Sequence, residues 1–190
     1  MRSFECVFFF CCLAFLNLIW AKIDIVRSDF GLETCNDDKV KILGLDFYEN
    51  SCGGKNLLPY IEWLDHNSTT KSYLITLTSA IKPTITVHFL AWNIPAFLNT
   101  ISDSTRFQDI GAVVGLNSYN KRNYIGPCFK NIYNNTSECM KFTLYSLNVE
   151  HIDLSEDADY YEVMAYLKSM SRVDGIVIDQ LSLYSIFTFK

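Results

Sequence analysis

The sequence contains little glycine and almost no proline. Of its 190 residues, eight are glycine and four are proline. A glycine-rich loop that cradles phosphate therefore has few candidate positions, and the run Cys52–Lys55 lacks both its spacing and the Ser or Thr that follows its lysine. No internal repeat and no linker rich in Pro, Gly or Ser interrupts the chain, so we expect a single domain.

Positive charge is in short supply as well. The 16 Lys and Arg residues are outnumbered by 21 Asp and Glu, which leaves a formal net charge of −5. Because an acidic chain repels the phosphate backbone, we exclude nucleic acid as a main partner. Hydrophobic residues make up 49% of the chain, a share that excludes an intrinsically disordered protein.

The common catalytic and metal-binding patterns are missing. No two of the three histidines, His66, His88 and His151, have the spacing of metal ligands, and the sequence has no C-x-x-C pair. It has no Gly-x-Ser-x-Gly elbow either. The acidic run 153–164 lacks the glycine and the glutamate of a calcium-binding loop. We therefore expect a protein that is not an enzyme and that uses no metal or cofactor.

The longest hydrophobic run lies at the amino terminus. Residues 1–21 combine a basic start at Arg2, an apolar stretch from Cys6 to Trp20 and a small residue, Ala21, suited to a cleavage position. This pattern predicts a signal peptide over 1–21 and a single domain over 22–190 without a membrane span. A buried terminal segment and an uncleaved anchor are the alternatives. We expect the secretory pathway, with secretion, the extracellular space or a vacuole as the destination.

Four cysteines follow the predicted signal peptide. They are Cys35, Cys52, Cys128 and Cys139. An even number in an oxidising compartment predicts two disulfides, and three connectivities are possible. We favour the local pairs Cys35–Cys52 and Cys128–Cys139, with free buried thiols as the alternative.

Three glycosylation sequons are compatible with export. They begin at Asn67, Asn134 and Asn135. Chains rich in asparagine also produce such triplets by chance, so the sequons are candidates for a glycoprotein and do not by themselves establish one.

Hydrophobic alternation dominates the rest of the chain. It predicts strands at 39–45, 73–78, 85–92, 141–149 and 176–189. A single helix is predicted from the apolar spacing of Tyr160, Val163, Met164 and Leu167. The fold class is therefore mainly β, a two-sheet β sandwich with short peripheral helices, one of them near the C-terminus. Its expected core is Tyr73, Ile75, Leu77, Phe89, Phe142 and Leu144.

One histidine differs from the other two in its surroundings. His88 lies inside the apolar run Val87–Leu90, and a buried histidine needs a hydrogen-bond partner. From the residues alone, a satisfied core histidine and a ligand-binding histidine are equally good interpretations.

Three blocks of sequence carry a family resemblance. The first is CGGKNLLPYIEW at 52–63 with TKSY at 70–73, and the second is VHFLAWNIPA at 87–96. The third combines GLNSY at 115–119, YIGPC at 124–128 and KFTLYSLNV at 141–149. In this order they resemble the phosphatidylethanolamine-binding protein family, and more closely its prokaryote-type branch, which also includes secreted eukaryotic proteins.

The resemblance implies a β sandwich with one small pocket at a sheet edge. In the family that pocket takes an anionic group such as phosphate or a phospholipid head group. Carried over by motif, its residues here are His88, Tyr124, Gly126 and Pro127. Members are mostly binding or regulatory proteins, and some inhibit proteases or kinases.

This sequence departs from the family pattern at two motifs. The Asp-Pro-Asp-x-Pro motif falls at 79–83 and has lost both acidic residues, while the His-Arg pair falls at Glu138–Cys139. The second exchange removes anion donors and adds a negative charge. Two hypotheses follow. The first is a secreted, non-enzymatic protein that binds a small anionic ligand or phospholipid head group in a partly degenerate pocket. The second is a protein-interaction or inhibitory module with a vestigial pocket.

Overall fold

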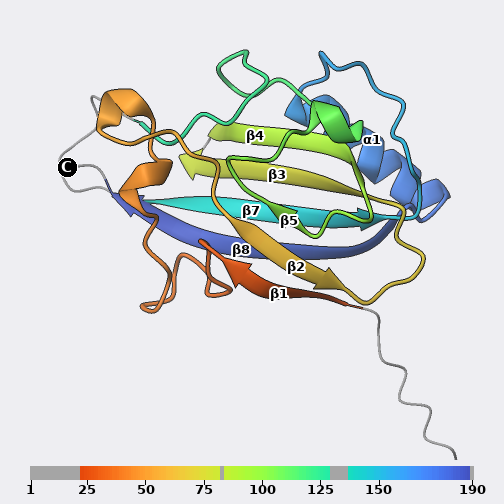
Figure 1. The fold of residues 1–190 in the computed structure, drawn as a ribbon, viewed down its shortest axis with the longest axis horizontal. Helices are drawn as coiled ribbons and strands as arrows, with labels where there is room; N and C mark the ends of the chain where they lie inside the picture. Colours follow the sequence, from red (N-terminus) through yellow and green to blue (C-terminus); the bar gives the residue numbers. More distant parts are fainter. Residues whose placement is uncertain (1–21, 82–83, 129–136, 189–190) are drawn as a thin grey trace, which may run out of the picture.

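Two antiparallel β-sheets pack face to face in the computed structural model, which describes residues 22–81, 84–128 and 137–188 (Figure 1). The smaller sheet has the order β1-β2-β5, formed by Ile23–Ser28, Ile61–Asp65 and Thr100–Ile101. The larger sheet has the order β6-β4-β3-β7-β8. Its strands are Val113–Val114, Thr84–Pro95, Ser72–Ile81, Ser137–Leu147 and Val177–Thr188. The predicted mainly β sandwich is confirmed.

The main core lies between the two sheets. Alternate residues of β3 and β7 point into it, because side chains of a strand alternate between its faces. The six expected core residues, Tyr73, Ile75, Leu77, Phe89, Phe142 and Leu144, are all buried there. Trp63 of the smaller sheet packs edge-on against Tyr73, with 5.2 Å between ring centroids.

A second core covers the opposite face of the larger sheet. Leu74, Leu90 and Trp92 on that face pack with Val163 and Leu167 of the helix α1, Tyr160–Val173. The helix begins with a capping box, in which Asp159 accepts from the Glu162 backbone N–H and the Glu162 carboxylate accepts from that of Asp159. The predicted helix is confirmed, and the larger sheet is buried on both faces.

The strand predicted at 39–45 is wrong. This segment forms a single bridge, Ile42 to Ile186, along the edge of β8, and continues into the short 3₁₀ helix η1, Leu45–Phe47. Leu43 is the one buried apolar residue of the stretch, and one buried side chain cannot hold a strand against the sheet. A second 3₁₀ helix, η2, follows at Asn50–Cys52.

The favoured disulfide pairing is also wrong. The structure joins Cys35 to Cys139 and Cys52 to Cys128, across 104 and 76 residues of sequence. Proximity in sequence is a poor guide here, because the segment before η1 runs along β8 and so reaches the adjacent strand β7. Two disulfides are consistent with an extracellular or secreted protein.

Several sequence predictions lie outside the described residues. They concern the signal peptide at 1–21 and the sequons at Asn134 and Asn135. Asn67 lies in the turn between β2 and β3, where its side-chain oxygen accepts hydrogen bonds from the backbone and hydroxyl of Thr69. In the part of the chain that the structure describes, no helix has the length and hydrophobicity to cross a bilayer.

Candidate functional site

His88 lies at an irregularity in β4. Leu77 pairs with Phe89 and Thr78 pairs with Val87, so His88 is the extra residue of a β-bulge. Bulges redirect a side chain relative to regular alternation and are common near functional sites. This one brings the imidazole to Ser79 of the neighbouring strand β3.

Both ring nitrogens of His88 have partners. Nδ1 lies 2.7 Å from the Ile125 carbonyl oxygen, which can only accept, so Nδ1 carries the proton. Nε2 then accepts from the Ser79 hydroxyl at 2.9 Å. The side chain is fully buried. Burial lowers the pKa of His88 to about 4, although its hydrogen bond to Ile125 acts in the opposite direction. The imidazole is therefore neutral at physiological pH.

The three other residues assigned by resemblance belong to the segment 124–127, which is hydrogen-bonded to β4 at His88. The Ile125 backbone N–H donates to the His88 carbonyl at 3.1 Å, which aligns the segment 124–127 with the edge of β4. Tyr124 is buried and its hydroxyl donates to the Phe47 carbonyl at 2.7 Å. The Gly126 N–H donates to the Asn56 side chain. The motif residues thus meet at one place, where their polar groups are used in contacts within the protein.

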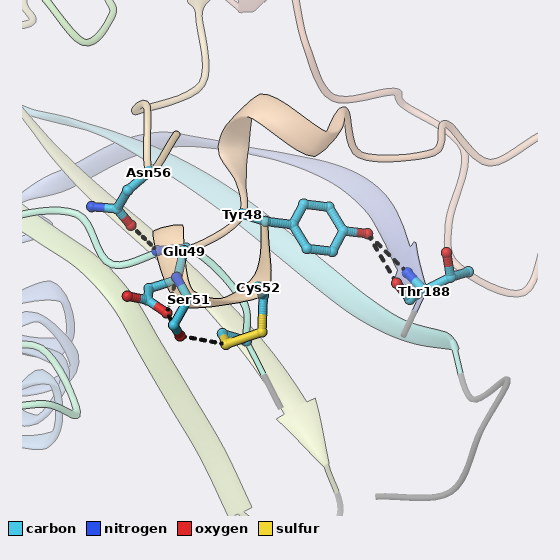
Figure 2. The surroundings of a disulfide bond; sticks show 8 residues. Tyr48, Glu49, Ser51, Cys52, Asn56 and Thr188 are labelled. Atoms are coloured by element: carbon cyan, nitrogen blue, oxygen red, sulfur yellow. Dashed lines mark hydrogen bonds between the residues drawn. A yellow bond between two sulfur atoms is a disulfide. The ribbon is translucent and has the colours of Figure 1, made fainter. Parts of the chain in front are cut away.

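The segment 45–56 covers this place, and three further contacts attach it besides the Tyr124–Phe47 hydrogen bond. Figure 2 shows the Tyr48 ring reaching Thr188 at the end of β8, where the Tyr48 hydroxyl accepts from the Thr188 N–H at 3.0 Å. The disulfide Cys52–Cys128 is the second attachment and the Asn56–Gly126 hydrogen bond the third. A Cβ at Gly126 would collide with the backbone of Phe47 and Tyr48. The cover is therefore close enough that only glycine fits beneath it.

The place where His88, Ser79 and the segment 124–127 meet is called the His88 region below. Acidic side chains border it. The Tyr119 ring centroid lies 6.5 Å from that of His88. Burial raises the pKa of Tyr119, and the charges of Glu49 and Glu138 raise it further. Within the described residues, Glu138 Oε2 is buried without a hydrogen-bond partner, and burial raises the pKa of this carboxyl group. The electrostatic surroundings of His88 are thus unfavourable for an anion.

A separate cleft of about 310 Å³ opens beside Tyr124. Its apolar lining includes Leu58, Phe89, Phe107 and Val114. Its polar lining includes Asn56, Ser102, Asp103, Thr105, Gln108, Arg122 and Asn123. His88 does not line it. Of the four residues assigned by resemblance, Tyr124 alone lines the cleft, and Asn56 also contacts both places.

Comparison with known proteins supplies the family. The family model described as phosphatidylethanolamine-binding protein matches residues 37–173. The chain belongs to this family. The resemblance found in the sequence motifs is therefore confirmed, and the matched range includes the His88 region and the cleft.

Solved structures of phosphatidylethanolamine-binding protein relatives share the fold. Escherichia coli YbcL, described as a new member of the mammalian family, has 19% sequence identity and a TM-score of 0.70, and the match covers 90% of this chain and 99% of that one. The homolog CT736 from Chlamydia trachomatis has 16% identity and a TM-score of 0.65, with 90% and 98% covered. No curated protein matches the chain.

Two residues of the His88 region were missed from the sequence. Ser79 holds the first acidic position of the family's Asp-Pro-Asp-x-Pro motif, and it now hydrogen-bonds His88. That position was a signal which could have identified it as the histidine's partner. Asn56 carried no comparable signal, although its side chain joins the cover to both the Tyr124 carbonyl and the Gly126 N–H.

Proposed function

We propose that this member of the phosphatidylethanolamine-binding protein family is an exported, non-catalytic protein-interaction module whose histidine pocket no longer binds anions. The observation that carries the proposal is the state of His88, which is fully buried with both nitrogens hydrogen-bonded. A phosphate group would have to displace Ser79 or the Ile125 carbonyl to reach the ring.

The energetic cost of binding an anion at His88 supports this choice. Charging a histidine with a pKa of about 4 at pH 7 costs about 4 kcal/mol. Glu138 replaces a donor of the family with a carboxylate, and Glu49 lies within electrostatic range of the same Tyr119. Neither residue can donate a hydrogen bond to phosphate when ionised. The same state of His88 argues against its use as a catalytic base.

A rigid, exposed apolar segment supports a protein partner. Leu32, Ile42 and Leu45 are 63%, 66% and 59% exposed, and all belong to the segment 29–47. Backbone hydrogen bonds to Tyr184 and Ile186 of β8 hold this segment, and Cys35–Cys139 ties it to β7. A rigid surface loses little entropy on binding, and a partner that buries these apolar groups would remove them from water. We assign segment 29–47 to a protein with a complementary apolar surface.

The first test is an NMR titration of the isotope-labelled mature protein. Inorganic phosphate and a lysophospholipid are added separately, and the backbone amide shifts of His88 and Ile125 are followed. We expect no saturable shift with either ligand. A saturable shift at these two amides would favour the anion-binding hypothesis and overturn the proposal.

The second test maps the partner surface. Leu45 is replaced by the photo-crosslinker p-benzoylphenylalanine in the exported protein, and Phe97, which is 77% exposed on the β4–β5 connection, is replaced in the control. We expect a discrete crosslinked protein from position 45 only. Equal crosslinking at both positions, or none at position 45, would contradict an interaction surface on segment 29–47.

A further inference from the structure

The cleft beside Tyr124 has an apolar floor. Leu58, Phe89, Phe107 and Val114 line it and are all buried, and the rings of Phe89 and Phe107 lie 5.2 Å apart between centroids. Its volume of about 310 Å³ lies at the lower end of the range for small-molecule sites. The floor therefore suits an apolar group such as an aromatic ring or a short alkyl chain.

Some polar groups of the rim are used within the protein. The Asn56 carboxamide bonds to the backbone of Tyr124 and Gly126. The Thr105 hydroxyl accepts from the Ser102 N–H, and the Asn123 amide nitrogen donates to the Tyr124 carbonyl. These contacts fix the shape of the rim, and the atoms that make them already have hydrogen-bond partners within the protein.

Other rim groups are free, and most of them are acceptors. Asp103 uses Oδ1 to accept from the Leu58 N–H, while Oδ2 has no partner among the described residues. In the same part of the chain, no hydrogen bond engages the Asn123 side-chain oxygen or the Gln108 carboxamide. A ligand that donates hydrogen bonds satisfies more of these groups than one that accepts them.

The charge balance of the rim is negative. Arg122 pairs with Glu156 at 3.2 Å and with Asp157, so two carboxylates already compensate its charge. Asp103 takes part in no ion pair among residues 22–81, 84–128 and 137–188. Among the described residues, the one uncompensated charge that lines the cleft is therefore a carboxylate beside an apolar floor.

We infer that this cleft binds an organic ammonium group carried on an apolar body. The ammonium pairs with Asp103, the apolar body rests on Phe89 and Phe107, and Gln108 and Asn123 accept remaining N–H or O–H groups. Two sources share this chemistry: a small free amine and a lysine side chain of another protein. The site is distinct from the His88 region and from the apolar segment 29–47.

The test compares three probes with the same phenyl body and different head groups. Phenethylamine carries an ammonium, 2-phenylethanol is neutral and phenylacetate is an anion. Binding to the mature protein is followed by the amide shifts of residues 102–108, which report the cleft, and of residues 119 and 138, which report the His88 region. We expect saturable shifts at 102–108 in the order phenethylamine, then phenylethanol, with phenylacetate weakest. An Nα-acetyl-lysine amide titration identifies the source, because tighter binding of this probe than of phenethylamine assigns the cleft to a protein lysine.

Two variants separate charge from shape. Asp103→Asn keeps an acceptor for the Leu58 N–H and should weaken phenethylamine about fivefold, the scale of an exposed ion pair. Asp109→Asn is the matched control, since it removes the same charge from the neighbouring 3₁₀ helix, η3 (Gln108–Ile110), without lining the cleft. It should leave the affinity within about twofold, and thermal melting checks that both variants fold.

The outcomes are distinguishable. Asp103→Lys should reverse the preference, so that phenylacetate binds better than phenethylamine. The inference is overturned if phenylacetate binds the original protein as well as phenethylamine does. It is also overturned if Asp103→Asn and Asp109→Asn weaken the amine equally, or if none of the probes shifts residues 102–108.

Discussion

The His88 region and the cleft meet at Tyr124 but are built in opposite ways. Around His88, both ring nitrogens are buried and hydrogen-bonded, and a segment that a disulfide attaches covers them. In the cleft the apolar groups are buried, and several polar groups of the rim have no partner among the described residues. The difference shows that retained motif residues and an open binding surface need not coincide. We propose that the motif residues here have a structural role and that binding takes place in the cleft beside them.

The largest effect on stability is expected from truncating a buried aromatic side chain of the main core. Phe142→Ala should destabilise the protein by about 3–5 kcal/mol, because the Phe142 ring is fully buried in the main core. Phe89→Ala should cost less, since its ring borders the cleft and water can enter the space it leaves. Urea unfolding measures both. A cost below about 1 kcal/mol for Phe142→Ala would show that the core is misassigned.

Removing either disulfide should lower the free energy of unfolding by a similar amount. Replacing both Cys52 and Cys128 by Ala should lower the free energy of unfolding by about 4 kcal/mol, because the unfolded chain gains the entropy of a loop of 76 residues of separation. Replacing Cys35 and Cys139 should cost a similar amount.

Amide hydrogen exchange then distinguishes the two disulfides. Exchange at Ile125, next to His88, should accelerate when the Cys52–Cys128 bond is removed and stay unchanged when the Cys35–Cys139 bond is removed. Equal acceleration in both variants would mean that the cover does not depend on its own disulfide.

A pH dependence of stability should arise from His88. Its pKa is about 4 in the folded state and about 6.5 when unfolded, so the unfolded chain binds a proton first as the pH falls. The free energy of unfolding should therefore drop by about 3 kcal/mol between pH 6.5 and 4 on account of this group. Glu138 acts in the opposite direction, because its pKa is raised in the folded state.

The variant His88→Gln isolates the histidine from other titrating groups. Comparing the slope of stability against pH in His88→Gln and in the original protein removes the contribution of Glu138. The original protein should show the steeper fall between pH 6.5 and 4. Identical slopes would contradict a buried, neutral His88.

The smallest effect is expected from the hydrogen bonds of the cover. Asn56→Ala removes two bonds, to the Tyr124 carbonyl and the Gly126 N–H, and should cost about 2 kcal/mol. Asn50→Ala is a suitable control, since it lies in η2 of the same cover and no side-chain hydrogen bond engages it among the described residues. Thermal melting should separate the two variants, and equal melting temperatures would show that Asn56 does not fasten the cover.

Much of the fold could be predicted from the sequence. Strands with strong alternation, such as those containing Tyr73–Leu77 and Phe142–Leu144, were correctly assigned with their faces, because each face packs on a different core. The segment 39–45 was misassigned since a single buried residue, Leu43, does not distinguish a strand from an edge loop. The disulfide pairing depended on tertiary proximity, which spacing does not encode.

The motif predicted a ligand pocket formed by His88, Tyr124, Gly126 and Pro127, and their role in ligand binding stays a prediction. The structure does bring the segment 124–127 to His88, through the Ile125–His88 hydrogen bond. Whether His88 is open or closed to a ligand depends on its contact with Ser79 and on the cover at 45–56. Both form only in the folded chain. The cleft was missed altogether, because its lining comes from five separate segments of the chain, and only folding brings them together.

The most direct test of the closed histidine is the nitrogen NMR spectrum of its imidazole, recorded from pH 3 to 8 with and without inorganic phosphate. We expect a neutral ring protonated at Nδ1, a pKa of about 4 and no change when phosphate is added. A pKa near 6.5 that rises further with phosphate would show an open, anion-binding histidine and contradict the central claim.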